Sequence, residues 1–221
     1  MKVALGINYW DDLDGLIDIL TNETLYDFVD IIYVINGRYE GRTDLPHYNP
    51  DTLTDIPKIF SKVFLLNMHN KKQIDKRNKY FELAQKDEQD FLIVVDSDEN
   101  VIIDDVELFD STLRGLVKRP ERCFPIIIDH EQVTKMRVPR LFKWHFDYRY
   151  RQNEGQNISH GSIWTEYGKG DHDIIQDMHE WRRDHERHTG VEGVHMTHNK
   201  KHRPKKRVIA DRIYYDENPT R

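Results

Sequence analysis

The sequence predicts an α/β protein with a mostly parallel central sheet. Short apolar runs at residues 2–7, 29–35, 61–66 and 91–95 have the length and β-branched content of buried strands. About 20 to 30 residues separate one run from the next, and helical patterns fill two of these intervals. This alternation predicts parallel strands joined by crossovers. A chain of 221 residues is long enough for one such domain with a full core.

The first two predicted strands are joined by a helix. Residues 2–7 form the first strand, which ends in the polar-aromatic turn Asn8-Tyr9-Trp10. Residues 11–25 place leucine and isoleucine at helical spacing behind two aspartates that would cap a helix. Residues 29–35 form the second strand, and Asn36-Gly37 ends it as a turn pair.

The next predicted elements lead to a fully buried strand. Residues 38–57 contain three prolines and little periodicity, which predicts a long loop with at most one short helix. Residues 61–66 predict the third strand and residues 73–85 a helix. Residues 91–95 then predict a fourth strand, buried on both faces of the sheet.

The second half of the chain is less regular. Residues 124–129 and 137–146 predict two more strands, residues 173–186 a charged helix, and residues 191–197 a short strand. A polar tail follows from residue 199. No repeat or linker divides the chain.

Composition narrows the class of protein. The formal net charge of −6 argues against a dedicated nucleic-acid binder. One cysteine, Cys123, excludes an internal disulfide and is typical of a reducing compartment. The apolar start is too short for a signal peptide, and no run approaches the ~20 apolar residues of a membrane span. We therefore expect a cytoplasmic protein with no membrane partner.

An acidic run, Asp96-Ser97-Asp98-Glu99, directly follows the fourth predicted strand. Open α/β sheets bind ligands at the carboxyl ends of their strands. Two aspartates around one small residue supply oxygen ligands that suit a hard divalent cation, with positions left for substrate phosphates. A strand end followed by a helix-capping turn uses the same residue types, so the run alone leaves both interpretations open.

The order of the pieces resembles a nucleotide-sugar glycosyltransferase of the GT-A fold, of the Asp-x-Asp, family 2-like kind. The resemblance rests on Asn8-Tyr9-Trp10 after the first strand, Lys76-Arg77-Asn78 in a helix ahead of the acidic run, and Val94-Val95-Asp96-Ser97-Asp98-Glu99 as the Asp-x-Asp motif. Pro139-Arg140-Leu141-Phe142 is similar to the family's Arg-Leu-Phe strand. Val194-His195-Met196-Thr197-His198 is similar to the segment whose histidine completes a metal site.

The resemblance implies a single Rossmann-like GT-A domain over residues 1–221. Residues 1–100 would bind the nucleotide sugar, residues 101–198 would form an acceptor half, and residues 199–221 a basic tail or lid. The implied activity is transfer of a sugar from a nucleoside diphosphate sugar, a UDP-sugar first, to an acceptor hydroxyl. The implied setting is the cytoplasm of a bacterial or virus-infected host cell, and the oligomeric state stays open.

The implied cofactor is Mn²⁺ or Mg²⁺, which would bridge the two phosphates of the leaving group. Asp98, as an exposed strand-end carboxylate, is the expected direct ligand. Asp96 would contact the metal through water or hold the sugar and ribose hydroxyls. His198 is the candidate histidine ligand, which would favour Mn²⁺, and His195 is the reserve. Alternation along a strand puts the two histidines on opposite faces, so both cannot serve.

The carboxyl ends of the first two strands are the expected nucleotide cradle. Tyr9 would stack on the base and Asn8 would bond to its edge. Asn36 would hold the ribose or base, and Arg77 would approach the base or diphosphate. Ordinary turn chemistry also explains Asn36 before a glycine, and an ion pair with a nearby acid also explains Arg77.

A lid over the donor is expected from the basic run at residues 200–207. Lys201, Arg203 and Lys205 would close over the diphosphate and keep water out. Such a run is more often a solvated tail.

The catalytic base is expected in a predicted helix. If the reaction inverts the anomeric centre, a carboxylate must take the proton of the acceptor. Asp173, Asp177 and Glu180 share one helical face, and Glu180, then Asp177, is the preferred base. A charged surface helix has the same pattern, and a retaining enzyme needs no such base.

The expected acceptor is a glycan or DNA. Residues 143–151 mix aromatic and basic side chains, which suit sugar rings as well as nucleobases. Small enzymes that glycosylate hydroxylated DNA bases, phage-encoded ones among them, would fit this pattern. Two other functions stay open. One is a metal-dependent nucleotidyltransferase or phosphohydrolase, although residues 8–12 do not form the usual Gly-rich phosphate loop. The other is a non-catalytic nucleic-acid-binding protein.

Overall fold

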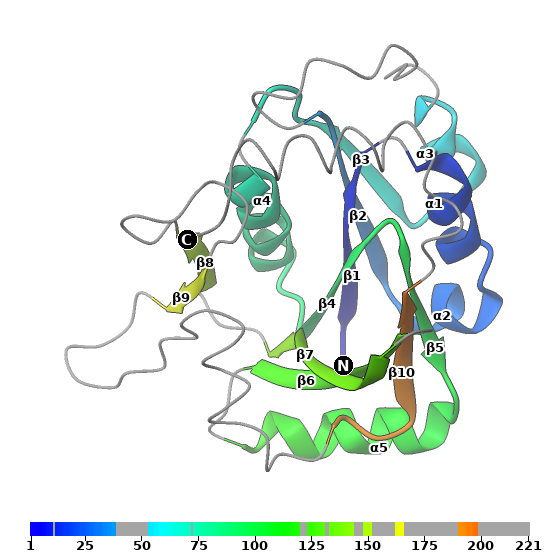
Figure 1. Cartoon of the computed structure of the whole chain (residues 1–221), viewed down its shortest axis with the longest axis vertical. Coiled ribbons are helices and arrows are strands. Elements are labelled where there is room, and N and C mark those ends of the chain that lie inside the picture. The colour runs from blue at the N-terminus through cyan, green and yellow to red at the C-terminus, as the bar shows by residue number, and fades with distance from the viewer. Residues whose placement is uncertain are drawn as a thin grey trace.

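The protein is an α/β structure built on one large curled sheet (Figure 1). The strand order in the eight-stranded sheet is β3 (Val63–Asn67), β2 (Ile31–Asn36), β1 (Val3–Tyr9), β4 (Phe91–Asp96), β7 (Val133–Lys143), β6 (Cys123–His130), β10 (Val194–His198) and β5 (Glu99–Ile103). The strands β8 (Tyr148–Arg151) and β9 (Ser162–Thr165) pair in a separate sheet. The computed structural model describes residues 1–10, 12–38, 53–71, 73–119, 123–130, 133–143, 148–151, 162–165 and 190–198.

The N-terminal strands form the parallel part of the sheet. They are β1 (Val3–Tyr9), β2 (Ile31–Asn36), β3 (Val63–Asn67) and β4 (Phe91–Asp96). β1 lies between β2 and β4, and β2 lies between β1 and β3, all in parallel. All residues of β1 are buried, as expected for a central strand with both faces covered. The four strands therefore end together at one edge, called here the carboxyl edge.

The remaining strands continue the sheet with mixed directions. They are β5 (Glu99–Ile103), β6 (Cys123–His130), β7 (Val133–Lys143) and β10 (Val194–His198). β7 is antiparallel to both β4 and β6, whereas β10 is parallel to β6 and antiparallel to β5. β4 and β5 are consecutive in the chain, but β7, β6 and β10 lie between them in the sheet. Figure 1 shows the two strands rising to a common turn.

Helices cover both faces of the sheet. Tyr80 and Phe81 of one helix join an apolar cluster with Tyr33 on one face. Leu16 and Phe109, from two other helices, join a larger cluster on the opposite face. The helices are α1 (Leu13–Leu20), α2 (Glu23–Phe28), α3 (Ile56–Ile59), α4 (Gln73–Lys86) and α5 (Val106–Val117). Among the described residues, no helix is long and apolar enough to cross a membrane.

The predicted α/β class is confirmed, with parallel N-terminal strands as expected. The predicted single helix at residues 11–25 is wrong, because the chain forms α1 and α2 instead. The break lies at Asn22, whose Oδ1 accepts from the backbone N of Leu25 at 3.2 Å and so caps α2. Asn22 Nδ2 also donates to the carbonyl of Val101 at 2.9 Å, which ties this break to β5.

Four of the described elements were not predicted: β5, α5, β8 and β9. The apolar run of β5 is short and lies between acidic residues, so it gives little periodicity. α5 has an apolar face of Phe109, Leu113 and Leu116, but its exposed side also carries Val106, Leu108 and Val117, which blurs the pattern. The predicted helix at residues 173–186, the basic run at 200–207 and most of the predicted loop at 38–57 lie outside the described residues.

Candidate functional site

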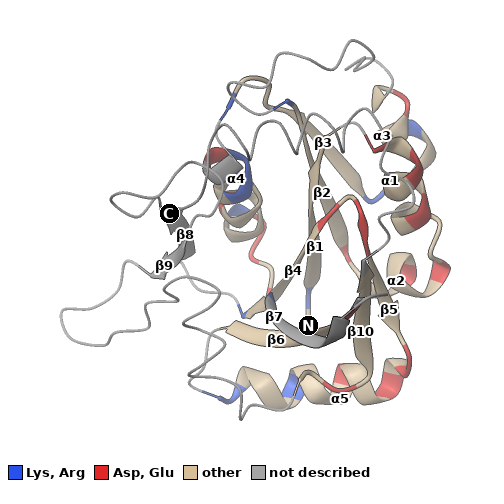
Figure 2. Ribbon diagram, viewed as in Figure 1, with Lys and Arg blue, Asp and Glu red and all other residues tan. Residues whose placement is uncertain are grey.

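The acidic turn, residues 96–99, lies at the carboxyl edge of the sheet. Asp96 ends β4 beside Asn8 of β1, and Glu99 begins β5. The backbone N of Ser97 donates to the carbonyl of Asn8 at 3.3 Å, which fixes the turn to the end of β1. Figure 2 shows the acidic colour at the tip that joins β4 and β5. The expectation of an exposed Asp98 is wrong, since this residue is only 4% exposed.

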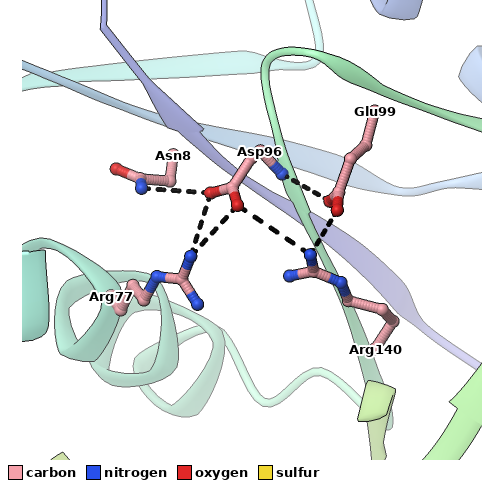
Figure 3. A network of polar contacts seen from close by, with 5 residues as sticks. All are labelled: Asn8, Arg77, Asp96, Glu99 and Arg140. Atoms are coloured by element: carbon pink, nitrogen blue, oxygen red, sulfur yellow. Dashed lines mark hydrogen bonds and ion pairs between the residues drawn. The ribbon is translucent and has the colours of Figure 1, made fainter. Parts of the chain in front are cut away.

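Three side chains from different elements surround the Asp96 carboxylate (Figure 3). Asn8 Nδ2 donates to Asp96 Oδ1 at 3.1 Å. Arg77 Nη2, from α4, donates to both carboxylate oxygens at 3.1 Å. Arg140 Nη2, from β7, lies 3.8 Å from Asp96 Oδ2. These contacts fix the position of the Asp96 carboxylate. The Asp96 side chain is 28% exposed, so part of it remains reachable by a ligand.

Glu99 forms the second half of this network. Its Oε1 accepts from Arg140 Nη2, and its Oε2 accepts from the backbone N of Asp96 at 2.9 Å. Glu99 is 4% exposed and Arg140 8% exposed, so this ion pair is buried. Buried charges are tolerated when they are paired and hydrogen-bonded. Glu99 and Arg140 meet both conditions, because they form an ion pair and a hydrogen bond with each other.

The surroundings of the turn shift the pKa values of Asp96 and Glu99 in opposite directions. Burial alone would raise the pKa of Asp96, but the guanidiniums of Arg77 and Arg140 outweigh it and hold that pKa below its usual range. Burial raises the pKa of Glu99 above its usual range despite Arg140, and the nearby charges of Asp96 and Asp98 add to this effect. Asp96 is therefore an ionised group, which can only accept hydrogen bonds.

The N-terminus of α1 packs against the acidic turn. Asp12 Oδ1 accepts from the backbone N of Gly15 at 3.2 Å and caps the helix. A Cβ atom at position 15 would clash with the carbonyl oxygen of Ser97. Only glycine therefore permits the first turn of α1 to lie this close to the acidic turn.

A buried lysine connects the ends of the first two strands. Lys76 Nζ donates to the carbonyl of Tyr9 at 2.8 Å and to that of Gly37 at 2.6 Å, and the residue is 0% exposed. The sequence pattern included Lys76 beside Arg77 but predicted no role for it. The position of Lys76 one residue before Arg77 was the only available signal, because the carbonyl groups it contacts are not visible in a side-chain pattern.

The residues predicted to cradle the nucleotide separate into two groups. Asn8 and Arg77 both contact Asp96. Arg77 therefore forms the ion pair with a nearby acid that was one of its two predicted roles. Tyr9 is 4% exposed and belongs to the apolar core. Asn36 is 0% exposed, and its Nδ2 donates to Asn67 Oδ1 at 2.7 Å, between the ends of β2 and β3.

The two candidate histidines lie on β10, which is a strand as predicted. In the pairing of β10 with β5, His198 is opposite Glu99, next to the acidic turn, and His195 is opposite Ile102. The side chain of His198 lies outside what the structure describes. His195 Nδ1 lies 2.6 Å from Asp104 Oδ2, at the other end of β5.

The remaining predicted site residues lie outside the described residues. They are the candidate bases Asp177 and Glu180, with Asp173, and the lid candidates Lys201, Arg203 and Lys205. Their roles stay predictions.

The acidic turn brings together oxygen donors of the type that hard divalent cations prefer. Asp96, Asp98 and Glu99 bring three carboxylates close enough to influence one another, against the guanidiniums of Arg77 and Arg140. Oxygen donors and a local excess of negative charge favour such a cation. Within the described part of the chain, no group of three or more His, Cys, Asp or Glu side chains is arranged to hold a metal. Mg²⁺-type sites for phosphate substrates commonly use one or two carboxylates, with the substrate supplying further oxygens.

No protein-family model matches the sequence, and no curated protein matches it. Among solved structures, TarS of S. aureus aligns with a TM-score of 0.43 and 12% identity over 62% of this chain and 23% of its own. GalNAc-T7 with UDP, GalNAc and Mn²⁺ aligns with a TM-score of 0.41 and 13% identity over 65% and 26%. The mannosyltransferase PcManGT from Pyrobaculum calidifontis, with GDP-Man and Mn²⁺, aligns with a TM-score of 0.39 and 11% identity over 60% and 36%.

These three structures are longer than this chain, which spans about a quarter of TarS and of GalNAc-T7. A cytidylyltransferase from Leptospira borgpetersenii also aligns, with a TM-score of 0.35 and 12% identity over 64% of this chain and 59% of its own. At identities and TM-scores this low, the likenesses assign no activity to the chain.

Proposed function

We propose that the protein is a divalent-metal-dependent glycosyltransferase that uses a nucleoside diphosphate sugar, with a UDP-sugar as the first candidate. One observation carries this proposal, the buried acidic turn at the carboxyl edge of four parallel strands. Ligands of open α/β sheets bind at this edge. Asn8 and Arg77 already converge on Asp96 there, which gives a fixed polar surface for a donor.

In this proposal Asp96 and Asp98 have different roles. A divalent cation, when bound, neutralises the charge that develops on the diphosphate as the sugar leaves. Asp98 is the direct ligand, because Asp96 already accepts hydrogen bonds on both of its oxygens. Asp96 then accepts from the ribose or sugar hydroxyls through its exposed part. Lys201, Arg203 and Lys205 close over the diphosphate, and Glu180, or Asp177, takes the acceptor proton if the reaction inverts.

The donor proposal is tested by calorimetry of UDP, GDP and CDP with Mn²⁺, with Mg²⁺ and with EDTA. UDP is expected to bind in Mn²⁺ and to bind weakly in EDTA. At ~100 times its dissociation constant it should add ~2.7 kcal/mol to the free energy of unfolding. Equal affinity in EDTA would remove the metal role, and no binding by any of the three nucleotides in Mn²⁺ would refute the donor class.

Product analysis then separates reaction types. Release of UDP with a glycosylated product, tested on oligosaccharides and on DNA with hydroxylated bases, is the expected result. Release of pyrophosphate from a nucleoside triphosphate and a sugar phosphate would instead identify a nucleotidyltransferase.

His198→Ala is expected to raise the Mn²⁺ concentration needed for half-maximal activity at least ~10-fold, as for loss of a partner at a metal site. The reason is its backbone position opposite Glu99, beside the acidic turn. The measurement is activity against Mn²⁺ concentration, and high Mn²⁺ should partly restore the variant. His195→Ala is the matched control, because His195 contacts Asp104 instead. Equal metal dependence in the two variants would remove His198 from the proposed site.

A further inference from the structure

Glu99 and Arg140 form a contact that the donor proposal does not use. Arg140 stands on β7 and Glu99 begins β5, and the two residues are 41 positions apart in the sequence. Both are buried, and Figure 3 shows the guanidinium of Arg140 between the carboxylates of Asp96 and Glu99.

Arg140 is shared unequally by its two carboxylate neighbours. Its Nη2 donates to Glu99 Oε1, whereas the same nitrogen lies 3.8 Å from Asp96 Oδ2, which is an ion-pair contact but is beyond hydrogen-bond distance. Among the described residues, Asp96 Oδ2 thus receives one close donor, Arg77 Nη2 at 3.1 Å. A guanidinium that moved from Glu99 to Asp96 would occupy more of the acceptor capacity of that oxygen.

Glu99 also fixes the backbone of Asp96. Its Oε2 accepts from the Asp96 backbone N at 2.9 Å, so one carboxylate holds Arg140 with one oxygen and the end of β4 with the other. We infer that Glu99 is a positioning residue, which holds Arg140 away from Asp96 so that the Asp96 carboxylate stays available to hydroxyl groups of the donor. This inference rests on the proposed function and gives a specific role to a side chain that the donor proposal does not use.

Two substitutions and their combination separate this role from simple structural support. Glu99→Gln keeps the size of the side chain and an oxygen acceptor for the Asp96 N–H, but it removes the charge that holds Arg140. Arg140→Gln removes the guanidinium itself. If Glu99 acts by restraining Arg140, Glu99→Gln matters only while Arg140 is present, so the two substitutions are not additive.

The expected results concern calorimetric binding of UDP and of UDP-glucose in Mn²⁺. Glu99→Gln should weaken binding at least ~10-fold, as reported for partners that orient ligating groups. The double variant Glu99→Gln/Arg140→Gln should bind at least ~3-fold more tightly than Glu99→Gln alone, and close to Arg140→Gln. Unfolding temperatures identify any variant whose loss comes from unfolding. The matched control cycle is Asp110→Asn and Arg114→Gln, an exposed ion pair on α5, and it should leave binding unchanged.

Two results would overturn the inference. One is wild-type binding by Glu99→Gln, and the other is a double variant that binds as weakly as Glu99→Gln. If Glu99→Gln alone does not fold, the double variant and Arg140→Gln still decide, since a double variant at least ~10-fold weaker than Arg140→Gln contradicts the restraint. A wild-type protein that binds neither ligand in Mn²⁺ would instead refute the proposed function, and the positioning role of Glu99 would fall with it.

Discussion

Replacing Asp98 with Asn is expected to weaken Mn²⁺-dependent UDP binding at least ~100-fold and to abolish sugar transfer. Asparagine matches aspartate in size and keeps one oxygen acceptor, but it loses the negative charge that would hold the cation. Calorimetry with UDP and Mn²⁺, repeated in EDTA, measures the effect. In EDTA the variant and the wild type should bind UDP equally weakly.

The burial of Asp98 makes a stability control necessary. Asp98 is 4% exposed, so its substitution also changes a buried polar group. Asp110→Asn, on the exposed face of α5, is the matched control for the change of charge. A folded Asp98→Asn variant with normal metal-dependent binding would rule out Asp98 as the ligand. A destabilised variant whose folded fraction keeps its specific activity would make the residue structural.

Gly15→Ala is expected to destabilise the protein by about 1–3 kcal/mol and to weaken Mn²⁺-dependent UDP binding. Alanine in a helix is ordinarily more stable than glycine by about 1 kcal/mol. Here the added Cβ meets the carbonyl oxygen of Ser97, a backbone atom that cannot rotate away, so α1 or the acidic turn must shift. We expect the clash to outweigh the gain in helix propensity. Chemical denaturation and calorimetry measure the two effects.

Gly115→Ala is the matched control for this substitution. Gly115 lies in α5, and a Cβ there would meet no atom within 4 Å. It should therefore stabilise the protein by about 1 kcal/mol and leave binding unchanged. If Gly15→Ala is as stable as Gly115→Ala and binds UDP normally, the acidic turn does not depend on its contact with α1.

The sequence was sufficient to predict the parallel strands, because each is an apolar run long enough to be recognised. It also placed the acidic turn at the carboxyl edge, because Asp96 follows one of these runs directly. It did not predict that Asp98 is buried, since α1 and β5 were not expected beside the turn. The pairing of Glu99 with Arg140 joins residues 41 positions apart and depends on the position of β7, which no local pattern reveals.

The length of the acidic turn is constrained by the strand pairings on either side of it, and not by the residue types within it. On one side, Asp96 is held in the ladder between β1 and β4, where it is paired with Asn8. On the other side, Glu99 is held in the ladder between β5 and β10, where it is paired with His198. Ser97 and Asp98 must join two ladders whose registers are set independently. An insertion or deletion of one residue that shifted either strand by one position would turn the side chains of that strand to the opposite face.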